Sequence, residues 1–345
     1  MKLRVTLLLA APLLALPLAA WDYEGHRMVN QIALASLPAD FPAFVREPAN
    51  AERIAFLAGE PDRWRNTNDL PLRHFNSLDH YLDVEYLHEA GLDPAKVSEL
   101  RSVFIAEYAA GRAANEDKFA RIDPAKNTDR TREWSGFLPW AVAEQYGKLK
   151  SGFSYLKTFE ESGGTPEEIA NAKANIVYIM GVMGHYLGDG AQPLHTTKHH
   201  NGWVGENPKE YTRWPGFHSW IDGGFMAKAG IKLDDLLPRV KPADPIPAVT
   251  PPGARDAVFS AVMDYMLEQH KLVEPLYALE KTGALRAEVA ATSAEGRAFI
   301  EARLLTGGQM LGAVWLTAWK QAGADSFLRA QLLKRQGLPP PTPAK

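Results

Sequence analysis

The chain of 345 residues is 46% hydrophobic, which is enough to bury a large core. Its 38 Lys and Arg residues against 41 Asp and Glu residues give a formal net charge of −3, so no overall basic field exists to hold nucleic acid, and phosphate must be bound locally. The sequence contains no cysteine, which excludes a disulfide framework.

The first twenty residues have the pattern of a secretory signal peptide. Lys2 and Arg4 precede an apolar stretch over residues 5–18 that prolines interrupt, and two alanines end it. A retained membrane anchor, the alternative, would need about 20 apolar residues without such breaks. We therefore expect residues 1–20 to be removed and the protein to be exported, periplasmic or secreted, with Trp21 as its first residue.

The remaining sequence predicts an all-α fold, because apolar residues recur at helical spacing and neither an alternating strand pattern nor a fixed-period repeat occurs. We expect one large multi-helix domain over residues 21–330 and a disordered, Pro-rich tail over residues 331–345. In chain order, the clearest helical patterns occur at residues 22–37, 98–114, 134–156, 165–185, 254–279 and 293–322.

The strongest helix start in the sequence is Thr165-Pro166-Glu167-Glu168. It combines an N-cap residue, a proline in the first turn and a capping-box glutamate. Apolar residues from Ile176 to Met183 continue this helix toward His185. Connections rich in proline and glycine are expected at residues 201–216 and 237–253.

Histidines paired with aspartates at a helical spacing indicate metal binding. His185 and Asp189, and again His218 and Asp222, are four residues apart, which on a helix places both side chains on one face. A proline between the two pairs turns the chain, so that His195 can return toward the first pair. Imidazole nitrogens and carboxylate oxygens are ligands that zinc prefers.

These motifs resemble those of a known superfamily. The sequence HYLGDGAQPLH over residues 185–195 resembles the core motif of the superfamily that contains zinc-dependent phospholipases C and the single-strand-specific zinc nucleases of fungi and plants. The start WDYEGH is similar to the family's mature N-terminus. Residues 59–65 are similar to its aspartate segment, residues 78–83 to its histidine segment and residues 303–315 to its closing helix, so the resemblance spans nearly the whole mature chain.

The resemblance implies a cofactor of three zinc ions. Trp21 would bind through its freed amino group and its carbonyl, and Asp189 would bridge two ions. His74 is the alternative to His80 in the histidine segment. The implied groups are Asp62, His80, His185 and Asp189 for the first ion, Trp21, His26 and Asp189 for the second, and His195, His218 and Asp222 for the third.

The same resemblance implies a phosphodiesterase that works by attack of zinc-bound hydroxide on phosphorus. Asp62 would orient or deprotonate the attacking water, Arg65 would donate to developing charge, and Tyr81 would stack on a base. The pair His218 and Asp222 is of the nuclease type, because phospholipases of the superfamily tend to carry Glu at the second position. We expect a nuclease that prefers single-stranded nucleic acid and has 3′-nucleotidase activity.

The segment after His195 departs from the Asp-x-Gly-Gly-Asn loop of many nucleases. Asn201 is its expected remnant and a candidate substrate-binding residue. We expect the aromatic residues and the histidines of this loop to have different roles. Trp203, Tyr211 and Trp214 are expected to reshape the pocket, whereas His199 and His200 are expected to be exposed loop residues.

The sequence is also compatible with two other functions. Aromatic residues in the pocket would also suit a phospholipase C, because they can surround a cationic phospholipid head group. A zinc-binding envelope protein without turnover would keep the same scaffold, although the presence of Asp62 and Arg65 argues against it.

Overall fold

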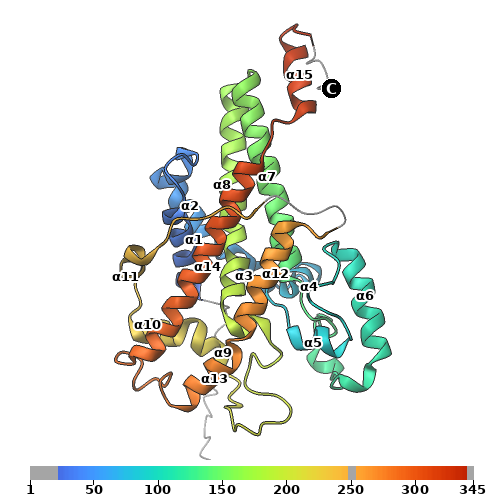
Figure 1. The fold of residues 1–345 in the computed structure, drawn as a ribbon, viewed down its shortest axis with the longest axis vertical. Coiled ribbons are helices and arrows are strands. Elements are labelled where there is room, and N and C mark those ends of the chain that lie inside the picture. Colours follow the sequence, from blue (N-terminus) through green and yellow to red (C-terminus); the bar gives the residue numbers. More distant parts are fainter. Residues whose placement is uncertain (1–21, 248–253, 340–345) are drawn as a thin grey trace, which may run out of the picture.

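The computed structural model describes residues 22–247 and 254–339, and within them every regular element is helical, which confirms the all-α prediction. Three long helices, α7 (Leu138–Ser162), α8 (Pro166–Ala191) and α14 (Ala294–Gln321), run along the long axis of the molecule (Figure 1). Helix α1 (Tyr23–Ser36) packs against both α8 and α14.

Most of the shorter helices lie around the lower half of these three long helices in Figure 1, and α15 lies at the opposite end. They are α2 (Pro48–Leu57), α3 (Glu60–Arg65), α4 (Leu70–Leu78), α5 (Val84–Glu89), α6 (Arg101–Ala114), α9 (Phe217–Ser219), α10 (Phe225–Ala229), α11 (Leu233–Leu236), α12 (Ala257–His270), α13 (Val273–Lys281) and α15 (Ser326–Arg335). Tight helical turns link them: η1 (Ala43–Arg46), η2 (Glu116–Lys118), η3 (Pro124–Lys126), η4 (Pro193–Thr196), the π-helical η5 (Trp220–Gly224) and η6 (Leu237–Arg239).

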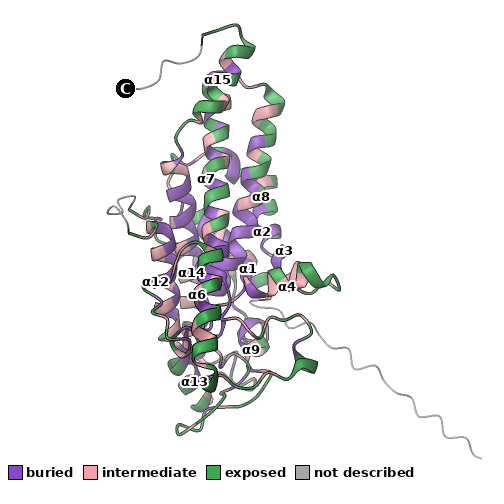
Figure 2. Ribbon diagram, turned by 90° about the vertical axis from the view of Figure 1, so that its right-hand side faces the viewer, coloured by how far each residue is buried: buried purple, intermediate pink, exposed green. Residues whose placement is uncertain are grey.

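Helix α8 begins as its sequence predicts. The Thr165 hydroxyl accepts from the Glu168 backbone N–H, and the Glu168 carboxylate accepts from the Thr165 N–H, which completes the capping box. The helix continues to Ala191, and every residue from Met180 onward is buried. Its last turns are enclosed because α1, α7 and α14 pack around them (Figure 2).

Two boundaries differ from the sequence-based expectation. The helical pattern over residues 254–279 divides into α12 and α13 around residues 271–272. Helix α15 extends to Arg335, into the segment expected to be a tail, and the Gln336 side chain donates to the Ser162 carbonyl (2.7 Å). Residues 1–21 and 340–345 lie outside the described residues. No helix in the described ranges has the length and apolar character needed to cross a bilayer.

Candidate metal centre

The predicted ligands converge from distant parts of the chain, apart from Trp21, which lies outside the described residues. They come from α1, α3, the turn after α4, α8, η4, and the α9–η5 segment. Their ligand atoms form three groups, each within 4.8 Å: His26, His185 and Asp189; Asp62, His80 and His185; and His195, His218 and Asp222.

Asp189 lies at the centre of these groups. Its Oδ1 is 3.4 Å from His26 Nε2 and 3.6 Å from His195 Nε2. Its Oδ2 is 2.9 Å from His80 Nδ1 and 3.3 Å from His185 Nε2. One carboxylate thus contacts imidazoles of all three groups, which is the arrangement that a bridging ligand requires.

The third group forms across a π-helical turn. His218 Nε2 lies 3.1 Å from Asp222 Oδ2 and 3.0 Å from His195 Nε2. Gln192, a residue that the sequence analysis did not single out, donates to Asp222 Oδ1 (2.7 Å). The backbone N–H of Asp22 donates to the Asp222 carbonyl (3.1 Å), so the start of α1 lies against this group.

Backbone carbonyls orient two of the imidazoles. His185 Nδ1 lies 2.7 Å from the Ala58 carbonyl, and His195 Nδ1 lies 2.7 Å from the His80 carbonyl. Because a carbonyl only accepts, each Nδ1 must carry the hydrogen. The lone pair of each ring is therefore on Nε2, which faces the cluster.

Glycines of the α8 motif allow α1 to approach closely. A Cβ at Gly188 would lie 2.8 Å from His26 Nδ1, and one at Gly184 would lie 1.5 Å from Asn30 Oδ1. Asn30 is buried and donates to two backbone carbonyls on α2 and α8. Glycine at these positions therefore lets α1 bring His26 to Asp189.

Several buried ligand atoms have no hydrogen-bond partner within the described ranges. Among them are both ring nitrogens of His26, Nε2 of His80, Oδ1 of Asp189 and Oδ2 of Asp222. An unpaired buried polar atom costs free energy, whereas coordination of a cation would satisfy it. The donor set of imidazoles and carboxylates fits Zn²⁺.

The protonation states also suit metal binding. Burial lowers the pKa of His80 to about 4 and lowers the pKa of His195, so both rings are neutral, the form that coordinates a metal. Burial would raise the pKa of Asp189, but the imidazoles of His195 and His185 outweigh it and hold the pKa well below its ordinary value. Burial raises the pKa of Asp222 well above its ordinary value, which favours the neutral form, whereas a bound cation would favour the carboxylate.

Other histidines occupy different environments. His74 Nδ1 contacts the Asp129 carbonyl at 2.6 Å, so His80 rather than His74 lies in the cluster. The expectation that His199 is exposed is wrong, because it is only 8% exposed and stacks on Trp203 at 4.0 Å. His200 is also partly enclosed and lines the cavity beside the cluster.

The aromatic residues expected to reshape the pocket do not line the cavity that opens beside the metal-ligand cluster. Trp203 and Tyr211 pack against Tyr277, at ring-centre distances of 5.3 and 5.4 Å. Trp214 is 49% exposed. Asn201 is exposed and does line the cavity.

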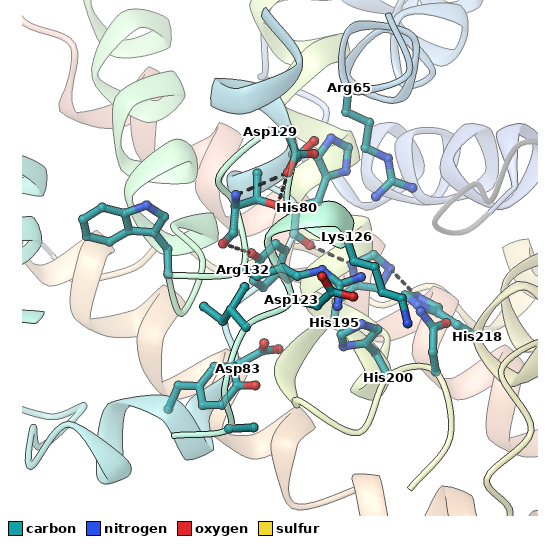
Figure 3. Close-up of a pocket in the computed structure, with 18 of the residues that line it drawn as sticks. Arg65, His80, Asp83, Asp123, Lys126, Asp129, Arg132, His195, His200 and His218 are labelled. Carbon is teal, nitrogen blue, oxygen red and sulfur yellow. Dashed lines mark hydrogen bonds between the residues drawn. The ribbon is translucent and has the colours of Figure 1, made fainter. Parts of the chain in front are cut away.

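A cavity of about 740 Å³ opens beside His80, His195 and His218 (Figure 3). Burial raises the pKa of Asp83 in its wall well above the ordinary value, which favours its neutral form. Cationic side chains outnumber carboxyl groups in the lining: Arg65, Arg73, Arg112, Arg121, Lys126 and Arg132 against Asp83, Asp123 and Asp129. The wall is therefore net positive, although the whole chain is net negative.

Arg65 and Tyr81 both lie at this cavity. Arg65 Nε is 2.8 Å from Asp62 Oδ1. The half-buried Tyr81 packs on Gly136, whose φ of +91° and closeness to the ring leave no room for a side chain, and its hydroxyl donates to the Thr131 carbonyl (3.4 Å). The sequence analysis missed the cations Arg121, Lys126 and Arg132, because they follow no regular spacing and lie outside the motifs.

We expect chelation to lower the melting temperature of the protein. A free ion concentration of 100 times the dissociation constant adds about 2.7 kcal/mol to the free energy of unfolding, which for a chain of this size corresponds to roughly 4 °C per ion. Differential scanning fluorimetry with and without a chelator, with metal content checked by elemental analysis, measures this. An unchanged melting curve after confirmed metal removal would show that packing alone holds the cluster together.

Comparison with known protein families, with curated proteins and with solved structures finds no match to this chain. Inference about its function rests on the geometry above and on the motifs of the sequence.

Proposed function

We propose that the protein is an exported zinc-dependent phosphodiesterase that cleaves single-stranded nucleic acid and 3′-nucleotides. The observation that carries the proposal is the meeting of three imidazole and carboxylate groups around Asp189, beside a cavity with cationic walls. The ligands suit zinc, and the cations suit the phosphate of a substrate.

Bound zinc ions would supply a nucleophilic water near neutral pH and would neutralise charge on the phosphoryl oxygens. The chain itself would contribute proton transfer and orientation. Asp62 Oδ1 lies 3.9 Å from both His80 Nδ1 and His185 Nε2, where it can accept a proton from a water beside these ligands. The Arg65 guanidinium lines the cavity, where it can donate to the equatorial oxygens of the phosphate.

The preference for single strands follows from the place of Tyr81. Its ring lines the same cavity as His80 and His195. A base that contacts this ring while its phosphate lies at the histidines must be unstacked from its neighbours. A single strand offers such bases at little cost, whereas a duplex must first unpair.

Tyr81→Ala is expected to raise KM for single-stranded DNA by about 5- to 150-fold with little change in kcat, because loss of base stacking costs roughly 1–3 kcal/mol. Steady-state kinetics on a short oligonucleotide measure the change. Tyr81→Phe keeps the ring and should stay close to the wild type.

A second control separates stacking from packing, since Tyr81 also covers Gly136. Tyr81→Leu keeps an apolar side chain at this contact but has no aromatic face. It should raise KM as Tyr81→Ala does while retaining more of the wild-type melting temperature. A wild-type KM for Tyr81→Leu would contradict the stacking role.

A phospholipase C is the second candidate, and a feature of α4 favours it. Leu70, Leu72 and Phe75 of this helix are exposed, Phe75 to 62%. Arg73 and Ser77 of the same helix line the cavity, and α4 stands out from the helical body (Figure 2). Exposed apolar side chains beside an anion-binding cavity would suit the surface of a lipid bilayer.

A substrate panel on the metal-loaded protein tests the proposal. It comprises single-stranded DNA, duplex DNA, RNA, a 3′-nucleotide and phosphatidylcholine vesicles. We expect cleavage of the single-stranded nucleic acids and of the 3′-nucleotide. Release of phosphocholine from vesicles with all nucleic acids left intact would replace the nuclease by the phospholipase.

A further inference from the structure

The segment between α6 and α7 forms one wall of the cavity. Residues 115–137 cross it with only the short turns η2 and η3 as regular structure. The segment contributes Arg121, Lys126 and Arg132 to the lining, opposite His195 and His218 from a different part of the chain. In Figure 3 the side chains of Lys126 and Arg132 reach into the same space as these histidines.

These three cations differ from others around them in having no protein partner. Arg73 pairs with Asp129 at 3.8 Å, and the Arg112 guanidinium lies 4.1 Å from the centre of the Phe119 ring. In the described ranges, by contrast, no hydrogen bond or ion pair is formed by the side chains of Arg121, Lys126 or Arg132.

The nearest acidic residue of the segment does not neutralise them. Asp123 also lines the cavity, and its carboxylate accepts from the backbone N–H of Ala125 (3.0 Å), which caps η3. The other carboxylate that the segment contributes to the lining, Asp129, pairs with Arg73 of α4, so the three cations of this wall outnumber the acidic groups left to balance them. Unpaired cations around a concave surface attract anions more strongly than the same charges on a flat surface.

We propose that Arg121, Lys126 and Arg132 form a second phosphate-binding site, separate from the phosphate that reacts at the metal cluster. This inference rests on the proposed function and identifies its preferred substrates as chains that carry at least two phosphates, which bind at both positions. An oligonucleotide would place its scissile phosphate at the cluster and a neighbouring phosphate on the surface formed by Arg121, Lys126 and Arg132, here called the 121–132 wall. A phospholipid with a single phosphodiester would use only the first position.

The shape of the wall supports a chain-like ligand. A second hollow of about 770 Å³ adjoins the first, and the two share the lining residues Arg112, Phe119, Ala120, Arg121, Ile122 and Trp134. Aromatic rings next to a cation are the combination that holds single-stranded nucleic acid, because bases stack while phosphates pair. A strand extending from the cluster past Arg121 would meet both.

The test measures binding rather than turnover. The probe is a fluorescent phosphorothioate oligothymidylate of eight nucleotides, which resists hydrolysis, and the readout is anisotropy at several salt concentrations. The combined variant Arg121→Gln, Lys126→Gln and Arg132→Gln should weaken binding at least about 10-fold at low salt. It should also flatten the dependence of log Kd on log salt by about 2, because each lost phosphate contact of a single strand contributes about 0.7.

A control variant of equal charge isolates the local effect. Lys157→Gln, Lys228→Gln and Lys334→Gln together remove three exposed positive charges that lie outside the linings of both hollows. This variant should keep the wild-type salt dependence. If both variants bind the oligonucleotide equally, the second phosphate site is refuted. If the melting curve shows that the cavity variant does not fold, the single variants Lys126→Gln and Arg132→Gln replace it. Each should change the slope of log Kd against log salt by about 0.7.

A separate assay distinguishes this inference from the proposed function. The wild-type protein is given bis(p-nitrophenyl) phosphate, a diester with one phosphate and no neighbouring one. If it hydrolyses neither this ester nor DNA while the cavity variant still loses binding, the phosphate site stands and the enzymatic proposal fails. Hydrolysis together with unchanged oligonucleotide binding by the cavity variant refutes the second site alone.

Discussion

Asp189→Asn is expected to lose at least two of about three bound metal ions together and to lower activity by more than about 10²-fold. The substitution keeps the shape of the side chain but removes the charge and one oxygen. Both carboxylate oxygens face imidazoles, Oδ1 toward His26 and His195 and Oδ2 toward His80 and His185. Loss of a residue that only orients a metal ligand costs about 10- to 100-fold, and loss of a shared ligand should exceed this.

Asp222→Asn is the matched control. Asp222 is equally buried but approaches only the third group, at 3.1 Å from His218. This variant should lose one ion and keep the other two. Elemental analysis after exhaustive dialysis gives both stoichiometries. Loss of a single ion from each variant would contradict the bridging position of Asp189.

Arg65→Ala is expected to lower kcat by about 10²- to 10³-fold with a smaller effect on KM. This is the typical cost of removing a donor that binds charge developing in the transition state. Arg65 lines the cavity and lies three residues after Asp62 on α3, so one short helix presents a ligand and a cation to the same phosphate. Initial rates on a short single-stranded oligonucleotide provide kcat and KM separately.

Arg63→Ala on the same helix is the control for Arg65, because its exposed side chain pairs with Glu60 and does not line the cavity. It should leave both kinetic constants near those of the wild type. Metal content must be measured for Arg65→Ala as well, since its ion pair with Asp62 also holds a metal ligand in place. A loss of activity fully explained by loss of metal would refute a role in stabilising charge.

The predicted helices that carry the cluster could be inferred from local sequence. The capping box at Thr165 marks the start of α8, because two reciprocal hydrogen bonds depend only on residues three apart. The spacing of His185 and Asp189 places both on one face for the same local reason. The second pair forms through a π-helical turn instead, which still brings His218 to Asp222.

Other features could not be inferred because they depend on contacts between distant segments. The Gln336 side chain after α15 donates to the Ser162 carbonyl, and the Tyr277 hydroxyl donates to the carbonyl of the buried His199. The same holds for Gln192, whose hydrogen bond to Asp222 spans thirty positions. Sequence spacing carries no information on such pairs.

The sequence by itself determined the helical class and the start of α8, because both depend on residue type and short-range periodicity. The candidate ligands that the resemblance named, apart from Trp21, lie together in the structure. Only the tertiary structure decided that Asp189 contacts all three groups, that His80 rather than His74 joins them, and that unpaired cations of the 121–132 wall face the histidines. These arrangements arise when α1, α8 and the segment before α7 pack together. The burial and the net charge of a site where several segments pack together depend on all of these segments.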